Sequence, residues 1–197
     1  MESETTINSL YRRLHNFLGD LRYGRPLYGS TPSRYAHLGA HSTENSSYSS
    51  LSTIFDGAIR PDDVLVDVGC GRGRVINWWL SQGLHNRIVG IELDENIANE
   101  TRHRLRRFDN VQIIAGDATE ELPHDASLIY LYNPFGAGVM QSFKCRVKQM
   151  LVSSNRNVTR LVYLNCKHLD VFEHDPHCSI KKGEAVYPFA VIDISAA

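Results

Sequence analysis

The sequence has no apolar run that approaches the roughly 20 residues of a membrane-spanning helix, so we expect no membrane partner. Its first residues are polar and do not match a secretory signal, which favours a cytoplasmic protein. It also lacks an excess of charge of either sign, because the formal net charge is −1 at pH 7. Such a balance gives no general attraction to nucleic acid or to an anionic membrane surface.

The few cysteines are widely separated and form no CxxC pair: Cys70, Cys145, Cys166 and Cys178. This spacing argues against a zinc site and favours free thiols in a reducing compartment. We predict no metal site. With 197 residues, 42% of them hydrophobic, the chain is long enough for one well-buried α/β domain and leaves little for a second.

The most informative pattern that is present is an apolar run followed by a glycine-rich turn. Residues 64–68 are rich in valine and leucine, which predicts a parallel strand buried on both faces. Gly69, Gly71 and Gly73 follow at alternate positions, where glycine leaves room for a ligand against the main chain. The helix predicted next directs its free N–H groups to the same place. The alternative to a ligand-binding turn is an ordinary strand–helix turn, and the motifs in the rest of the chain distinguish the two.

Strand-like and helix-like patterns alternate along the rest of the chain. After the first strand, further strands are predicted over residues 87–92, 110–118, 127–135 and 160–165. Residues 178–183 and 189–194 predict two strands joined by a tight turn. This order predicts an α/β fold with a single doubly wound sheet, mostly parallel, with an antiparallel strand at the C-terminal end.

The N-terminal 47 residues differ from the rest. Apolar residues recur at helical spacing from Ile7 to Leu21, which predicts an amphipathic helix that starts near Thr5 or Thr6 and stops near Gly19 or Gly24. We expect it to cover part of a core or an active-site mouth, and partner docking is the other interpretation. The loop that follows is rich in Gly, Pro and Ser and in aromatic and cationic side chains: Tyr23, Arg25, Tyr28, Arg34, Tyr35, His37 and His41. This segment can be interpreted as a lid over a ligand or as a plain surface loop, and the sequence favours neither.

Polar residues close the first four predicted strands. They are Asp67, Glu92, Asp117 and Asn133. Because the carboxyl ends of parallel strands meet at one rim of the sheet, we expect these side chains to lie on the same rim, where such sheets bind their ligands.

With these motifs in this order, residues 48–165 resemble the Rossmann-like, class I S-adenosylmethionine-dependent methyltransferases. The resemblance assigns the stretch from Asp67 to Gly73, namely Asp67, Gly69, Cys70, Gly71 and Gly73, to the methionine part of the cofactor. It assigns Glu92 to the two ribose hydroxyls. It assigns Asp117 and Ala118 to the adenine ring. A nicotinamide or flavin enzyme is the rival within the fold, but its fingerprint needs a glycine where Arg74 stands.

The resemblance also extends to the end of the fourth strand. Asn133-Pro134-Phe135 stands where the family carries its fourth motif, beside the transferable methyl, and is typical of a small bacterial type. We hypothesise that the Asn133 side-chain oxygen and the Pro134 carbonyl orient an amine nucleophile, and that Asn133 also borders the cofactor. Phe135 would wall the pocket or stack on a flat acceptor. A helix cap is the alternative role of Asn133.

The resemblance therefore implies an enzyme that transfers a methyl group from S-adenosylmethionine to an unidentified acceptor and releases S-adenosylhomocysteine. A nitrogen nucleophile on a protein or a small molecule is favoured, and nucleic acid is less favoured. A basic face on the helix over residues 97–108 is interpreted as a solvated surface, with a nucleic-acid contact as the alternative. The chain divides into residues 1–47, a helix and lid segment, and residues 48–197, the methyltransferase domain. Tyr35 and Tyr48 are candidates for capping cofactor and substrate. The alternative function is a non-catalytic, cofactor-binding partner subunit.

Overall fold

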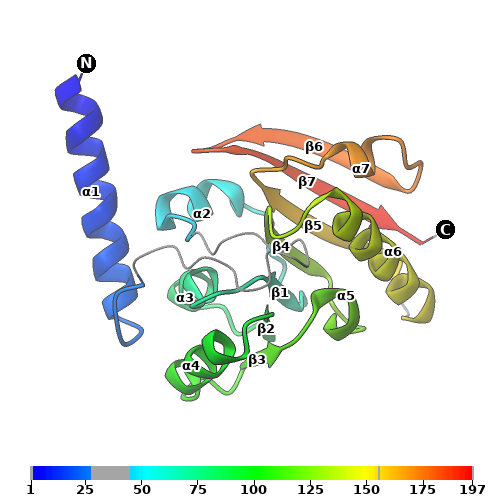
Figure 1. Cartoon of the computed structure of the whole chain (residues 1–197), viewed down its shortest axis with the longest axis horizontal. Helices are drawn as coiled ribbons and strands as arrows, with labels where there is room; N and C mark the ends of the chain where they lie inside the picture. Colours follow the sequence, from blue (N-terminus) through cyan, green and yellow to red (C-terminus); the bar gives the residue numbers. More distant parts are fainter. Residues whose placement is uncertain (1, 28–44, 155, 197) are drawn as a thin grey trace.

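The computed structural model describes residues 2–27, 45–154 and 156–196. A seven-stranded sheet runs through the centre in the order β3-β2-β1-β4-β5-β7-β6 (Figure 1). The strands are β1 (Leu65–Val68), β2 (Ile88–Glu92), β3 (Val111–Ala115), β4 (Leu128–Tyr132), β5 (Val158–Leu164), β6 (Cys178–Glu184) and β7 (Pro188–Ser195). β7 is antiparallel to both of its neighbours, and the other described pairs are parallel. The predicted doubly wound, mostly parallel sheet is confirmed.

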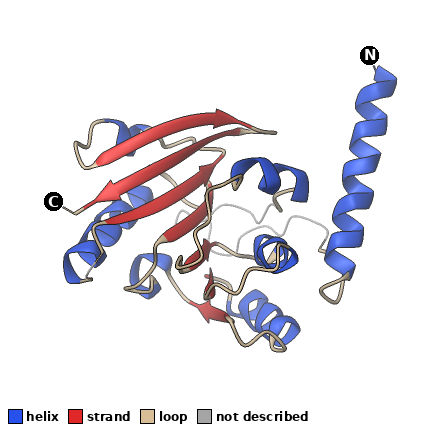
Figure 2. Ribbon diagram, turned by 180° about the vertical axis from the view of Figure 1, so that it is seen from behind, coloured by secondary structure: helices blue, strands red, loops and turns tan. Residues whose placement is uncertain are grey.

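Helices cover both faces of the sheet (Figure 2). The helices of the described residues are α1 (Glu2–Leu21), α2 (Tyr48–Ile54), α3 (Arg74–Ser81), α4 (Glu95–Leu105), α5 (Ala118–Glu121), α6 (Ala137–Ser153) and α7 (Asp170–Glu173), of which α1 does not cover the sheet. One apolar cluster joins the sheet to α2, α3 and α4, and a second joins it to α5, α6 and α7. Because both faces are covered, β1 and β2 are buried along their whole length and are mostly apolar, as the run at residues 64–68 predicted.

The sheet order reverses beside β1, which pairs with β2 on one side and with β4 on the other. The chain crosses from one face to the other at this point, so the connections after β1 and β4 diverge and leave a crevice at the carboxyl ends of the strands. The glycine turn follows β1 directly, and Asn133 follows β4 directly. The fold therefore brings the two motifs to the place where ligands bind in open α/β sheets.

Helix α1 differs from its prediction. It starts at Glu2, before the expected threonine caps, and ends at Leu21. It stands at the edge of the domain in Figures 1 and 2, and its described hydrogen bonds and ring contact with α2 and α3 come from its C-terminal half. Several of its apolar side chains are exposed: Leu10, Tyr11, Leu14, Leu18 and Leu21. The expectation that this apolar face covers a core is wrong, because periodicity identifies an apolar face and not what lies against it.

Most of the loop interpreted as a lid, including Tyr28, Arg34, Tyr35, His37 and His41, lies outside the described residues. Of the described part, Tyr23 is buried and packs against Phe108, with ring centroids 5.8 Å apart. The division of the chain between residues 47 and 48 stays a prediction.

Candidate functional site

The glycine turn connects β1 to α3 in a left-handed conformation. Gly69, Gly71 and Gly73 have φ values of 71°, 52° and 74°, which side chains with a Cβ rarely adopt. A Cβ on Gly73 would also lie 3.1 Å from Thr101 Cγ2 and from the Arg104 guanidinium. Thr101 Oγ1 donates a hydrogen bond to the Gly71 carbonyl at 2.9 Å. Helix α4 thus holds the turn from behind and keeps it close to the sheet.

Glu92 ends β2 and reaches across to this turn. One carboxylate oxygen accepts the Gly71 N–H at 2.8 Å, and the other accepts the Asp94 N–H at 2.9 Å. Burial raises the Glu92 pKa, and these backbone hydrogen bonds oppose the shift. Each oxygen keeps a free lone pair, so the carboxylate is held in one orientation and can still accept two further hydrogen bonds. That is the requirement for binding two neighbouring hydroxyls of a ribose.

Asp67 lies within β1, opposite Tyr130 of β4 and Gly90 of β2. It is 2% exposed, and its Oδ2 atom has no hydrogen-bond partner. Burial, and next the negative charge of Glu92, raise its pKa from 3.8 to about 8. A buried carboxyl group without a hydrogen-bond partner destabilises the folded protein, and such groups are often found at ligand-binding sites. Its neighbourhood suits a cationic group.

Asp117 follows β3 and caps α5. Its Oδ1 atom accepts hydrogen bonds from the Thr119 N–H and Oγ1–H, both at 2.8 Å, and its side chain is exposed. Ala118 next to it is buried. Gly116 donates to the Glu92 carbonyl, so this segment lies beside the end of β2. Asp117, Glu92 and Gly71 are thus brought to one rim of the sheet, as predicted.

Asn133 sits just beyond β4 with a φ of 41° and is buried. Its Oδ1 atom accepts a hydrogen bond from Tyr163 O–H at 3.0 Å. The helix-cap alternative is wrong, because α6 begins at Ala137 with Gly136 at its cap position. Phe135 packs its ring against Phe143 of α6, with centroids 5.5 Å apart.

Tyr48, the second candidate for a capping residue, is buried and points to α1. Its hydroxyl donates to Asp20 Oδ1 at 3.0 Å, and burial is the main cause that raises its pKa. Asp20 is fully buried and also forms a two-point ion pair with Arg74, the first residue of α3, at 3.0 and 2.7 Å. Arg74 in turn donates to the Leu27 carbonyl. This network ties the end of α1 to the helix that follows the glycine turn.

Helix α4 supplies a second tie that sequence reasoning missed. Arg104 donates to the carbonyls of Tyr23 and Arg72 and to Asn77 Oδ1, over distances of 2.6 to 2.9 Å. Burial lowers its pKa to about 10. The interpretation of the whole basic face as a solvated surface is therefore wrong at Arg104, which holds the turn and the N-terminal segment together. An exposed arginine and a structural one look alike in a single sequence.

Residues 65–151 match the family described as "Methyltransferase domain". A cobalt-precorrin-6B C(15)-methyltransferase (decarboxylating) of Archaeoglobus fulgidus is 30% identical over 97 residues, 49% of this chain and 56% of that protein. A ribosomal RNA small subunit methyltransferase A of Alkaliphilus metalliredigens is 35% identical over 68 residues, 34% of this chain and 23% of that protein. The chain therefore spans less than two thirds of the length of either relative.

Solved structures show the same fold. An RNA methyltransferase from Salinibacter ruber, in complex with S-adenosyl-L-homocysteine, superposes with a TM-score of 0.60 at 21% identity and covers 78% of this chain and 95% of that one. A SAM-dependent methyltransferase from Aquifex aeolicus gives 0.54 at 12% identity, over 74% of this chain and 89% of that one. These structures show that the chain has the fold of the Rossmann-like methyltransferases. Among the described residues, no helix is both long and apolar enough to span a bilayer.

Proposed function

We propose that the protein transfers a methyl group from S-adenosylmethionine to an acceptor and releases S-adenosylhomocysteine. The observation that carries this proposal is the pair of acids around the glycine turn. Glu92 is held by the Gly71 N–H at 2.8 Å, and the buried Asp67 keeps an oxygen without a partner. S-adenosylmethionine supplies an electrophilic methyl on a sulfonium and carries a cationic amino group. Two acids beside a turn of main-chain N–H groups suit such a cofactor.

We propose the following roles for the rim. Asp67 and the turn residues Gly69, Cys70, Gly71 and Gly73 hold the methionine part. Glu92 holds the ribose. Asp117 and the Ala118 N–H hold the adenine ring. The rim then fixes the direction of the sulfonium methyl, and alignment of a nucleophile with that methyl is the main contribution a protein makes to such a displacement.

The first experiment is a calorimetric titration of the protein with S-adenosylmethionine. Glu92→Gln is expected to weaken binding by about tenfold to a hundredfold, because charge-assisted hydrogen bonds to the ribose are lost and the amide nitrogen must face the N–H of either Gly71 or Asp94. Glu184→Gln, which makes the same change at an exposed position, is the control and should bind like the unchanged protein. Equal affinities of the two variants would remove Glu92 from the site, and no binding by the unchanged protein would refute the proposal.

We propose that the acceptor atom is a nitrogen, on a protein or a small molecule, and that Asn133 Oδ1 and the Pro134 carbonyl orient its lone pair toward the methyl. The Tyr163 hydroxyl already uses one lone pair of Asn133 Oδ1 and fixes the amide, so the second lone pair has a defined direction. Phe135 supports this loop through its contact with Phe143. Incubation with methyl-labelled cofactor and a cell lysate identifies the acceptor fraction. Binding of cofactor without any transfer of label would favour the non-catalytic subunit instead.

Asn133→Ala is expected to lower the rate of label transfer to that fraction by about tenfold or more, because the amine loses an orienting hydrogen bond. Affinity for the cofactor should change little. Asn165→Ala is a matched control, because Asn165 follows β5 with a φ of 51° and the substitution brings the same backbone strain. Equal rates for the two variants would show that only strain matters at Asn133.

We further propose that residues 1–47 form a helix and lid segment of a small bacterial, cytoplasmic methyltransferase, with Tyr35 and Tyr48 near the bound ligands. The ties of Asp20 to Arg74 and to Tyr48 support a link between this segment and the cofactor turn.

A further inference from the structure

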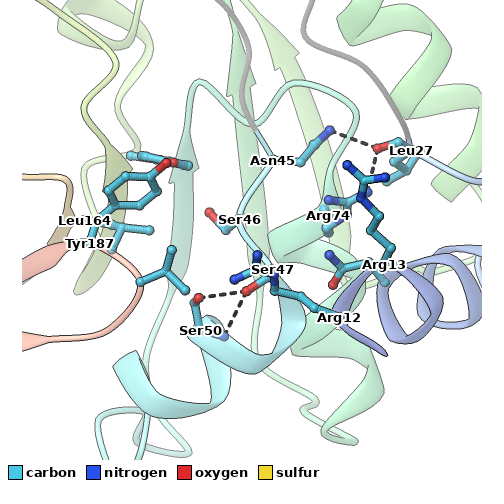
Figure 3. A pocket seen from close by; sticks show the side chains of 13 residues that line it. Arg12, Arg13, Leu27, Asn45, Ser46, Ser47, Ser50, Arg74, Leu164 and Tyr187 are labelled. Carbon is cyan, nitrogen blue, oxygen red and sulfur yellow. Dashed lines mark hydrogen bonds between the residues drawn. The ribbon is translucent and has the colours of Figure 1, made fainter. Parts of the chain in front are cut away.

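A cavity of about 430 Å³ lies between α1, the start of α2, the ends of β4 and β5, and the turn between β6 and β7 (Figure 3). Its size is that of a small-molecule pocket. Its lining does not include the acids of the rim or the glycine turn, so it is separate from the proposed cofactor cradle. Tyr132, which lines it, directly precedes Asn133. Leu164, which also lines it, is the last residue of β5, so the cavity lies at the same rim of the sheet as Asn133.

One wall of the cavity carries positive charge. Arg12 and Arg13 of α1 and Arg74 of α3 line it, and none of its described lining residues is acidic. Arg74 is paired with the buried Asp20. Arg12 and Arg13 are exposed, and neither forms an ion pair with another described residue. The protein as a whole has a net charge of −1, so this positive wall is a local feature and not a consequence of composition.

The opposite wall is aromatic and apolar. The rings of Tyr132 and Tyr187 lie 5.9 Å apart at an angle of 45°, and Leu164 and Val186 complete this side. Tyr187 is 41% exposed and Val186 is 54% exposed, so the turn between β6 and β7 presents apolar surface to the cavity mouth. Figure 3 shows Tyr187 and Leu164 on one side of the cavity, with Arg12 and Arg13 on the other. An occupant that satisfies both walls has an anionic group at one end and a flat or apolar body at the other.

We propose that this cavity holds the methyl acceptor and that the acceptor is a small molecule in which a phosphate or carboxylate group is attached to a planar ring. This inference rests on the proposed methyltransferase function. Arg12 and Arg13 bind the anionic group, since guanidinium groups match phosphate and carboxylate oxygens. Tyr132 and Tyr187 hold the ring. A small molecule is favoured over a polynucleotide, because two arginines at one cavity do not form the extended basic tract that a chain of phosphates requires.

The test uses phenyl phosphate as the probe, and its binding to the whole chain is measured by nuclear magnetic resonance titration. Phenol, which has the ring without the charge, and inorganic phosphate, which has the charge without the ring, are each expected to bind about tenfold more weakly or worse. The double variant Arg12→Gln/Arg13→Gln is expected to weaken phenyl phosphate binding by roughly tenfold or more. Arg60→Gln/Arg156→Gln removes the same charge outside the cavity and should bind phenyl phosphate like the unchanged protein.

Titration with S-adenosylmethionine separates this inference from the proposed function. Normal cofactor binding by Arg12→Gln/Arg13→Gln, together with weak phenyl phosphate binding, supports the acceptor pocket. Loss of cofactor affinity in that variant would overturn it, because the arginines would then serve the cofactor. Equal affinities for phenol and phenyl phosphate would overturn the acceptor pocket. The proposed function would still stand if the protein binds S-adenosylmethionine. Tighter, arginine-dependent binding of a 12-nucleotide RNA would assign the cavity to nucleic acid and overturn it as well.

Discussion

Asp20→Ala is expected to lower the free energy of unfolding by about 3–5 kcal/mol, the usual cost of removing one partner from a buried ion pair. The Asp20 side chain is fully buried, and that of Arg74 is 7% exposed. Without the carboxylate, the Arg74 guanidinium keeps only the Leu27 carbonyl as a described partner, and the Leu27 N–H and Tyr48 O–H lose their acceptor. Urea unfolding followed by circular dichroism measures the loss.

Two further variants make this expectation specific. Asp125→Ala breaks the Arg87–Asp125 pair, whose side chains are 45% and 35% exposed, and should cost below about 1 kcal/mol. Asp20→Ala/Arg74→Met removes the orphaned charge and should be more stable than Asp20→Ala alone. If Asp20→Ala costs no more than Asp125→Ala, the buried pair does not anchor α1 to α3.

Local patterns in the sequence predicted the rim, because each of its parts is encoded within a few residues. The apolar run and glycine turn at residues 64–73 predict a strand, a left-handed turn and a helix start from adjacent residues alone. The acid at the end of β2 then follows from the parallel order of the strands, and Glu92 lies within 2.8 Å of the Gly71 N–H. The four-residue helices α5 and α7 were not predicted, since so short a segment shows no helical period.

Contacts between distant residues could not be predicted in the same way. Asp20 and Arg74 are 54 residues apart, and Asn133 and Tyr163 are 30 apart, so no local pattern connects either pair. In the sequence, nothing distinguishes Tyr163 from the other apolar residues of β5. The cavity combines residues from α1, two strand ends and a hairpin turn, and only the folded chain brings them together. Long-range pairing is the part of the site that a single sequence does not encode locally.

Asp67→Asn is expected to change how stability depends on pH. The pKa of Asp67 is raised from 3.8 to about 8, so between these values the folded protein keeps a proton that the unfolded chain releases. Each pH unit in this window then lowers the free energy of unfolding of the unchanged protein by about 1.4 kcal/mol through this group. The variant lacks the group, so its free energy of unfolding rises relative to that of the unchanged protein from pH 4 to pH 8.

Urea unfolding of both proteins at pH 5, 6, 7 and 8 measures this difference. The slope against pH is the informative quantity, because the unpaired amide of the variant adds an offset that does not vary with pH. Glu92, whose pKa is also raised, is present in both proteins, so only its coupling to Asp67 differs between the two curves. Parallel curves would show that Asp67 is already ionised in the free protein, and would contradict the raised pKa.

The same carboxyl group couples cofactor binding to proton release. A cationic amino group beside Asp67 lowers the pKa of this carboxyl, so binding at pH 7 is expected to release about one proton. Calorimetric titrations of S-adenosylmethionine in two buffers of different ionisation enthalpy count the protons released. Asp67→Asn should bind more weakly and release almost none. Release of the same number of protons by the variant would place the titrating group elsewhere and remove Asp67 from the cofactor's cationic end.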